Sequence, residues 1–159
     1  GSQEGLYLAA DVLFDEADEL IVDEPTYPGA LAAFRSFTDR FSAIPLDGQG
    51  MRTDLLEELL AGRVRRHEPL PRAIYTIPSG HNPAGVTLTE PRRRHLAELA
   101  QRYGVLVLED DPYQLLLLDR GPGCRPCSGW LRATCCASTA SPRSSAPACG
   151  SATPRGRPS

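Results

Sequence analysis

Polar side chains that could bind a ligand follow three short apolar runs of this 159-residue sequence. The apolar runs are residues 20–22, 73–76 and 105–108, and the polar segments are residues 23–27, 78–83 and 110–113. Tyr27, in the first polar segment, could stack on a planar ring, and ordinary packing is the alternative. Asn82, in the second, could donate a hydrogen bond to a phenolate oxygen, or it could serve only the turn between His81 and Pro83.

The third polar segment begins with Asp110, which ends an apolar run. A carboxylate is costly to bury in such a place unless it is paired. A protonated ring nitrogen would be a suitable partner, and an Arg is the simpler alternative. Tyr113 lies three residues further on and could reach the same ligand.

Gly1, Ser2 and Gln3 precede a helical pattern. The free N–H groups and the partial positive charge of a helix N-terminus suit a phosphate, and Ser2 adds a hydroxyl donor. An ordinary Ser N-cap is the alternative. Together the segments specify a ligand with a phosphate, an aromatic ring, a phenolate oxygen and a ring nitrogen that needs a proton. Pyridoxal 5'-phosphate (PLP) has all four, and an acid beside its ring nitrogen keeps the ring an electron sink.

The apolar periodicity places these segments in an alternating pattern of helices and strands. We expect helices over residues 4–14, 28–37, 53–60 and 89–103, and strands over residues 20–22, 41–46, 73–76 and 105–108. Thr53 and Thr89 are candidate N-caps, and Pro91 fits the first turn of the last helix. Strands separated by helices predict the fold class α/β, with a mostly parallel sheet flanked by helices. Such sheets bind ligands beyond the carboxyl ends of their strands.

Four segments have the order and spacing of a known family. They are Gly1-Ser2-Gln3-Glu4-Gly5-Leu6, Asp23-Glu24-Pro25-Thr26-Tyr27-Pro28-Gly29-Ala30, Asn82-Pro83-Ala84-Gly85 and Glu109-Asp110-Asp111-Pro112-Tyr113. With them, residues 1–118 resemble the large, PLP-binding domain of class I/II PLP-dependent aminotransferases of fold type I. The resemblance is greatest to the subgroup of 2-aminoadipate and kynurenine aminotransferases and of the aminotransferase-like domains of MocR-type regulators.

The resemblance implies a role for each candidate residue. Ser2 and Gln3 would contact the cofactor phosphate, and Tyr27 would stack on the pyridine ring. Asn82 and Tyr113 would hold the O3' oxygen of the ring, and Asp110 would pair with the ring nitrogen. The substrates implied are an amino acid and a 2-oxo acid, and the intact protein would be a homodimer, as family members usually are.

The sequence departs from the family at the residue that anchors the cofactor. The family binds PLP covalently through a Lys in a Ser-(Phe/Thr/Ala)-Ser-Lys stretch, and a downstream Arg binds the substrate carboxylate. This sequence contains no Lys, because all 17 basic residues are Arg. It also begins at the phosphate-binding segment and ends before the small domain of the family. We therefore expect part of the cofactor cradle, no catalytic residue and negligible transaminase activity from this chain.

Three alternatives remain open. The sequence could come from a MocR-type transcription regulator, whose winged-helix DNA-binding domain would lie upstream. It could descend from a PLP-dependent lyase or decarboxylase, because one fold supports several reactions. It could also be a non-functional remnant that does not fold stably, since missing strands would leave the edges of the sheet uncovered.

Residues 119–159 differ in composition from the rest of the chain. All 20 acidic residues lie at or before Asp119, whereas all 5 Cys lie in the last 39 residues, of which 18 are Pro, Gly or Ser. We expect a disordered, low-complexity tail. Cys124 and Cys127 have CxxC spacing, but no second CxxC follows, so no metal site is predicted.

A shift of the reading frame would explain this tail. From Thr134 onward, the shifted codons are compatible with Val-Leu-Arg-Val-Asp-Ser-Phe-Ser-Lys and, further on, with Gly-Leu-Arg. This resembles the lysine motif of the family and the segment that follows it. We infer that a single frame shift near residues 118–121 removed the lysine motif.

The apolar runs and the start of the sequence predict a cytoplasmic protein, and the Arg run and two of the histidines are predicted to lie at its surface. A formal net charge of −3 gives no reason to propose a nucleic-acid or anionic-membrane partner. No apolar run approaches the roughly 20 residues of a membrane span, and no signal segment opens the sequence. The run Arg92-Arg93-Arg94 is interpreted as a solvated helix face, and His67 and His95 as surface residues. His81 borders the candidate site but matches no role in the family.

The frame-shift hypothesis makes a prediction about the coding DNA. Nucleotides across codons 115–145 should hold an adjacent frame that encodes the lysine motif and continues into the small domain of the family. Sequencing this stretch and some hundreds of bases on either side checks the prediction. An unshifted frame that encodes an intact alternative domain would contradict it.

Overall fold

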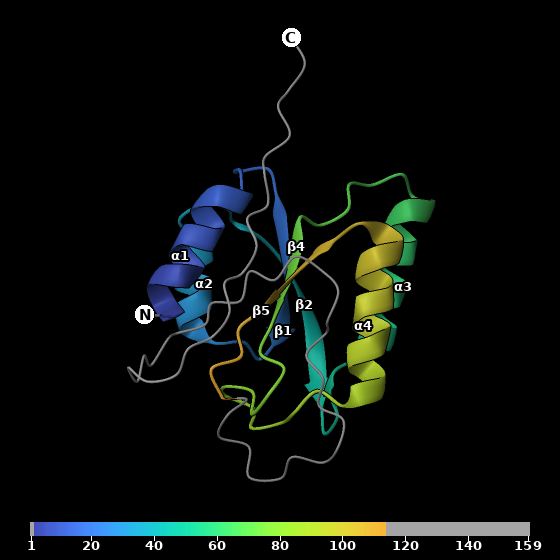
Figure 1. Ribbon diagram of the computed structural model, residues 1–159. Coiled ribbons are helices and arrows are strands. Elements are labelled where there is room, and N and C mark those ends of the chain that lie inside the picture. Colours follow the sequence, from blue (N-terminus) through green and yellow to red (C-terminus); the bar gives the residue numbers. More distant parts are fainter. Residues whose placement is uncertain (1, 114–159) are drawn as a thin grey trace, which may run out of the picture.

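The computed structural model describes residues 2–113, in which helices and strands alternate along the chain (Figure 1). The helices are α1 (Ser2–Leu13), α2 (Pro28–Phe34), α3 (Thr53–Arg65) and α4 (Glu90–Tyr103). The strands are β1 (Glu19–Glu24), β2 (Arg40–Asp47), β3 (Gly50–Met51), β4 (Ala73–Thr76) and β5 (Leu106–Glu109). The tail and the frame-shift point that the sequence predicts lie outside these residues. No helix in the described part has both the length and the apolar character needed to cross a membrane.

The strands form one sheet in the order β3-β2-β1-β4-β5. Strands β2, β1, β4 and β5 are parallel, and β3 returns antiparallel to β2. Val22 of β1 pairs with Tyr75 of β4, which in turn pairs with Leu108 of β5. The carboxyl ends of these three strands therefore meet at one edge of the sheet, the lower edge in Figure 1.

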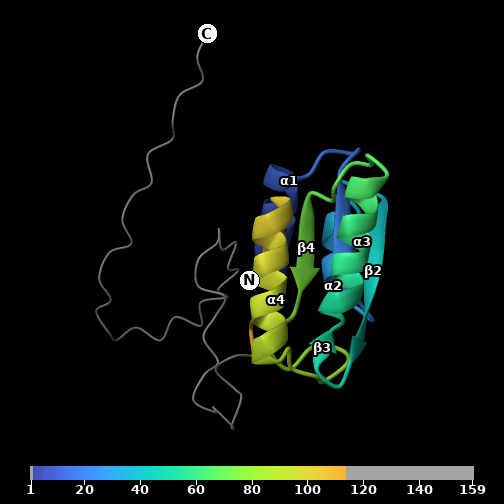
Figure 2. The same ribbon diagram turned by 90° about the vertical axis from the view of Figure 1, so that its right-hand side faces the viewer.

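Helices cover both faces of the sheet (Figures 1 and 2). Leu20 and Val22 belong to the core under α1 and α2, whereas Ile21 belongs to the core under α3 and α4. Successive side chains of a strand point to opposite faces, so a continuous apolar run serves both cores. The predicted α/β fold, with a mostly parallel sheet flanked by helices, is confirmed.

The elements agree in type and order with the sequence pattern, but some boundaries differ: α2 ends at Phe34, α3 continues to Arg65, and the short strand β3 was not predicted. The predicted strand 73–76 is confirmed at both ends. Thr53 is not an N-cap: it is the first residue of α3, and its hydroxyl lies 3.0 Å from Nδ1 of His95. Thr89 does occupy the N-cap position of α4, although its side chain makes no capping hydrogen bond. The α4 helix ends at Tyr103 and is followed by the C-cap residue Gly104, whose φ of 67° lies in the left-handed region that favours glycine.

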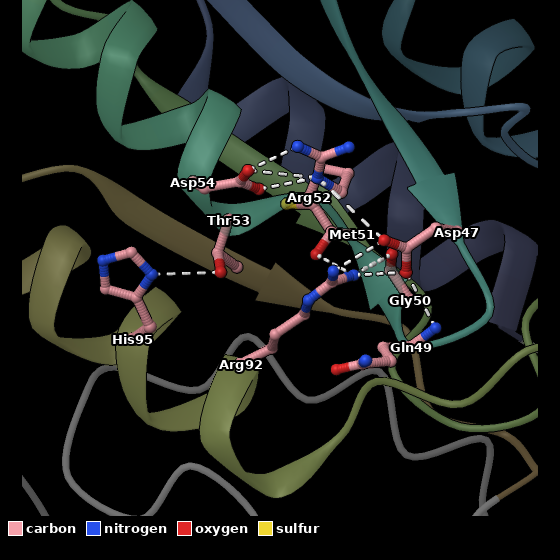
Figure 3. Close-up of polar contacts among 9 residues, drawn as sticks. All are labelled: Asp47, Gln49, Gly50, Met51, Arg52, Thr53, Asp54, Arg92 and His95. Carbon is pink, nitrogen blue, oxygen red and sulfur yellow. Dashed lines mark hydrogen bonds and ion pairs between the residues drawn. The ribbon is translucent and has the colours of Figure 1, made fainter.

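The two histidines predicted at the surface differ in their surroundings. His67 is exposed, as predicted. His95 is half-buried between α3 and α4, where its Nδ1 contacts Thr53 (Figure 3). Its Nε2 lies 3.2 Å from Oε2 of Glu57. It therefore joins two helices that are far apart in the sequence.

The interpretation of Arg92-Arg93-Arg94 as a solvated face is wrong for the first two residues. Figure 3 shows the Arg92 guanidinium between α4 and the β2–β3 hairpin. It donates to both carboxylate oxygens of Asp47 at 2.6 Å, and to the carbonyl oxygens of Gly50 and Met51 at 2.8 and 3.1 Å. The hydrogen bond from Arg92 also holds the pKa of Asp47 below its ordinary value. Only the Arg94 side chain, 73% exposed, fits the solvated interpretation.

Replacing Arg92 should therefore loosen the hairpin. Arg92→Ala removes two hydrogen bonds to backbone carbonyls and two to the Asp47 carboxylate, which keeps the Gln49 N–H as a donor. It should lower the free energy of unfolding by about 1–3 kcal/mol. Arg94→Ala is the matched control and should change it by no more than about 0.5 kcal/mol. Urea denaturation of the full chain measures both, and an equal effect of the two substitutions would contradict the assignment.

Candidate functional site

The loops that carry the predicted site residues leave the same edge of the sheet. Tyr27 follows β1, Asn82 follows β4, and Asp110 and Tyr113 follow β5. The terminal residues of β4 and β5, Thr76 and Glu109, are paired in register. The parallel topology thus brings together three loops that are far apart in the sequence, as Figure 1 shows.

Asp110 is buried at this edge and has a specific hydrogen-bond donor. The residue is only 4% exposed, and its Oδ2 accepts a hydrogen bond of 2.9 Å from the Tyr75 hydroxyl. Its backbone N–H donates to the carbonyl of Thr76 at 3.0 Å, which fixes the residue at the end of the sheet. Burial, and then the Asp110 carboxylate, raise the pKa of Tyr75. Tyr75 therefore stays protonated and remains a donor to Asp110 throughout the neutral range.

Tyr27 and Gln3 meet at the start of α2. Gln3 Nε2 donates to the carbonyl of Gly29 at 2.7 Å, so the first turn of α1 lies beside the loop after β1. The Tyr27 ring lies directly over Gly29, where a Cβ atom would come within 2.5 Å of three of its atoms. Tyr27 is half-buried, and its proximity also contributes to the raised pKa of Tyr75. Ser2 is the first residue of α1.

Asn82 lies in a tight turn whose base is His81. The His81 N–H donates to the carbonyl of Val86 at 2.8 Å, and its carbonyl accepts from the Gly85 N–H at 2.5 Å. The Asn82 side chain is half-buried, and within residues 2–113 its amide group makes no hydrogen bond. A Cβ added to Gly80 would lie 3.6 Å from Cβ of Tyr113, which places the loop after β4 beside the loop after β5.

Two buried residues below this turn, Asp23 and His81, face each other. Their side chains are 0% and 1% exposed, and Nε2 of His81 lies 3.2 Å from Oδ2 of Asp23. The pair is at ion-pair distance but is not aligned as a hydrogen bond. Oδ2 of Asp23 also accepts the backbone N–H of Ile77 at 3.2 Å, so the end of β1 is joined to the end of β4.

A buried Arg of α4 also holds the loop after β4. Arg93, 3% exposed, donates to the carbonyls of Leu88 and Pro78 at 3.0 and 2.8 Å, and to the Ser79 hydroxyl at 3.2 Å. Ser79 in turn donates to Oδ2 of Asp111 at 3.0 Å. The solvated interpretation of Arg93 is thus wrong, because this side chain links the loops after β4 and β5 to α4.

The loops at this edge carry groups that a planar ligand with both donors and acceptors would need. They offer a buried carboxylate at Asp110, an aromatic ring at Tyr27 and an amide at Asn82. Two further buried oxygens, Oδ1 of Asp23 and Oγ1 of Thr26, have no hydrogen-bond partner in the described part of the chain. Residues 2–113 contain no group of three or more His, Cys, Asp or Glu that could hold a metal ion. The CxxC pair lies outside these residues.

Sequence reasoning missed Tyr75, the Asp23–His81 pair and Arg93. Tyr75 lies inside an apolar strand, where its hydroxyl gives no signal in the hydrophobic pattern. Arg93 lies three and seven residues before Leu96 and Ala100 of the buried face of α4, a spacing that could have placed it on that face. Asp23 ends the apolar part of β1 just as Asp110 follows β5, which is the signal that could have found it.

Comparison with known proteins identifies the class. The sequence profile of the family described as "Aminotransferase class I and II" matches residues 1–122, so the chain belongs to this family. It is 42% identical over 130 residues to an aromatic-amino-acid aminotransferase from Thermococcus litoralis, which covers 82% of the chain and 31% of that relative. It is 33% identical over 125 residues to the mitochondrial kynurenine/alpha-aminoadipate aminotransferase of Bos taurus, with 76% of the chain and 29% of the relative covered. The chain thus spans about three tenths of the length of these relatives.

Solved structures of the same class share the fold. A kynurenine aminotransferase from Pyrococcus horikoshii, in complex with PMP, superposes with a TM-score of 0.68 at 42% identity, over 70% of this chain and 28% of that one. An alpha-aminoadipate aminotransferase from Thermus thermophilus, complexed with N-(5'-phosphopyridoxyl)-L-leucine, superposes with a TM-score of 0.63 at 37% identity, over 72% and 28%. The family is PLP-dependent, and the predicted class and cofactor are confirmed at the level of the family.

The Tyr75–Asp110 contact predicts a change of stability with pH. Tyr75→Phe removes the donor to a buried carboxylate and should lower the free energy of unfolding by about 1–3 kcal/mol at neutral pH. Because the folded-state pKa of Tyr75 is raised above its ordinary value of 10.0, the native chain should keep this stabilisation below pH 10 and lose it as the pH rises further.

Denaturation curves between neutral pH and the alkaline range measure this dependence. The alkaline loss of stability should be smaller in Tyr75→Phe than in the native chain. Tyr7→Phe, at a tyrosine that is 48% exposed, should retain the native dependence. Parallel curves for the native chain and Tyr75→Phe would show that Tyr75 is not a buried donor.

Proposed function

We propose that residues 2–113 form the larger part of a PLP cradle, derived from an aminotransferase that transfers an amino group between an amino acid and a 2-oxo acid. The observation that carries this proposal is the buried carboxylate of Asp110 at the edge where the loops after β1 and β4 also arrive. The membership of the family supports it. The residues present fit the cofactor, because their donors, acceptors and aromatic ring match its functional groups.

Each predicted residue has a role in this proposal. Asp110 would accept a hydrogen bond from the protonated ring nitrogen, and Tyr75 holds its carboxylate in place. Tyr27 covers one face of the ring. Asn82 and Tyr113 donate to the O3' oxygen.

The phosphate would lie at the beginning of α1. The N–H groups of the first helical turn have no intrahelical acceptor, and Ser2 and Gln3 provide them. The Gln3 side chain already donates to Gly29, so it would bind the phosphate mainly through its backbone and would fix α1 beside the Tyr27 loop. Gln3 is thus both a ligand of the phosphate and a link between two helices.

When bound, PLP supplies an electron sink for reactions at the α-carbon of an amino acid. The residues of this chain bind and orient it, and Asp110 keeps its ring nitrogen protonated. The 159 residues contain no Lys, so they offer no side-chain amine for covalent attachment or for proton transfer at the substrate. We therefore expect non-covalent binding of PLP and negligible transaminase activity.

Several predictions from the sequence stay predictions. They include the domain boundary at residue 118, the homodimer of the intact protein and the cytoplasmic location. The MocR alternative and the non-functional remnant also remain open. The relatives named above are aminotransferases, which favours the enzyme over the regulator. A winged-helix domain encoded upstream would favour the regulator.

Equilibrium dialysis of the full chain against PLP tests the proposal. The native chain should bind PLP, and Asp110→Asn should weaken binding by about ten- to a hundredfold, because a charge-assisted hydrogen bond is lost. The Asn oxygen can still accept from Tyr75, so the fold is retained. Asp39→Asn, at an exposed residue just before the amino end of β2, is the control and should bind like the native chain.

Reduction with borohydride followed by mass spectrometry reports any covalent attachment. The proposal predicts no adduct on a side chain. No binding by the native chain, or equal binding by Asp110→Asn, would refute the cradle. Turnover of an amino acid with a 2-oxo acid would refute the predicted inactivity.

A further inference from the structure

The turn that carries Asn82 is held from beneath by the His81 ring. Nδ1 of His81 lies 3.4 Å from the backbone N–H of Ala84, and this N–H is the donor in the contact. The backbone of His81 closes the same turn through its contacts with Gly85 and Val86. His81 is therefore joined to the turn at both its main chain and its side chain, and it is 2% exposed.

The contact with Ala84 determines where the His81 proton lies. An imidazole nitrogen that accepts a hydrogen bond carries no proton, so Nδ1 is the bare nitrogen of the ring. In the neutral ring the proton then lies on Nε2. Nε2 faces Oδ2 of Asp23 at 3.2 Å, and a carboxylate favours a proton on the nearest ring nitrogen.

Asp23 is fixed independently of the histidine. It is 1% exposed, and its Oδ2 accepts the Ile77 N–H at the end of β4. A buried carboxylate without a nearby cation is an expensive way to hold two strands together, since an apolar side chain would do so at lower cost. Joining the two strands therefore does not by itself explain why a carboxylate is buried at position 23. Control of the His81 tautomer would explain it.

We propose that Asp23 and His81 are positioning residues for the cofactor: Asp23 holds His81 in the form protonated at Nε2, and the bare Nδ1 then fixes the turn that presents Asn82. This inference rests on the proposed function, because Asn82 is assigned there to the O3' oxygen of PLP. His81 acquires a role that its position beside the site did not reveal. In this role both residues act through the turn that presents Asn82.

The charged and titratable groups around the pair agree with this assignment. Tyr75, on the neighbouring strand β4, is protonated and is directed to Asp110, not to Asp23. Arg93 approaches the loop from α4 but donates to Pro78, Leu88 and Ser79. Within residues 2–113, the polar contacts of the Asp23 side chain are thus those with His81 and Ile77.

The first test uses ¹⁵N NMR of histidine-labelled chain without PLP. The His81 ring should be protonated at Nε2 and bare at Nδ1, and the Ala84 amide should exchange slowly with solvent. Asp23→Asn, which removes the charge but keeps a side chain of the same size, should raise the fraction of rings protonated at Nδ1 and speed the exchange of the Ala84 amide. A native His81 protonated at Nδ1 would overturn the proposal, whether or not the chain binds PLP.

The second test separates positioning from stability. Asp23→Leu and His81→Phe should each lower the melting temperature, because each leaves one buried polar partner alone. The double variant Asp23→Leu/His81→Phe replaces both partners with apolar groups and should recover much of that stability. Its affinity for PLP should nevertheless remain about tenfold below the native value, and its Ala84 amide should stay poorly protected.

A matched control removes the other buried carboxylate of β1. Glu19→Leu breaks the contact of Glu19 with Arg63 at the amino end of the strand, far along β1 from the site. It should lower stability without changing the affinity for PLP. Full recovery of PLP affinity in the double variant would show that the pair is only structural. Absence of binding by the native chain would instead refute the proposed function, and the NMR result would still decide the tautomer.

Discussion

The buried carboxylate of Asp110 is the constraint on which the rest of the site depends. A charge at the end of an apolar strand is stable only if other groups are arranged around it, and the Tyr75 hydroxyl is one of them. Because Tyr75 belongs to β4, the carboxylate depends on the pairing of β4 with β5 and on the core under α1 and α2. The alternating helices and strands thus bring one carboxylate to the edge of the sheet where, in the proposed function, it would meet a cationic ring nitrogen.

Polar groups then hold the loops around this charge. Arg93 attaches the loop after β4 to α4 and, through Ser79, to the loop after β5. Asp23 attaches the same loop to β1. The cradle is therefore defined by interactions within residues 2–113, whereas the covalent tether of the family would have to come from a lysine that the 159 residues lack. In the proposed function, the residues that would orient the cofactor are present in this chain, and the residue that would bind it covalently is not.

Much of this arrangement could be predicted from the sequence, because the signals are local. Continuous apolar runs predicted a sheet covered on both faces, and the polar residues after each run predicted the edge from which the loops of Tyr27, Asn82 and Asp110 leave. The contacts of Arg92 with the β2–β3 hairpin could not be predicted, because they join segments more than forty residues apart. Tyr75 was hidden because a buried tyrosine contributes to an apolar run like any other large side chain. The roles of the site residues toward PLP remain proposals.

The most direct test of the account is ¹⁵N NMR of PLP labelled at its ring nitrogen and bound to the full chain. If Asp110 pairs with that nitrogen, the bound ring should be protonated at a pH at which the complex with Asp110→Asn is not. A bound ring with the same protonation in both complexes would mean that Asp110 does not face the cofactor, and the proposed cradle would be wrong.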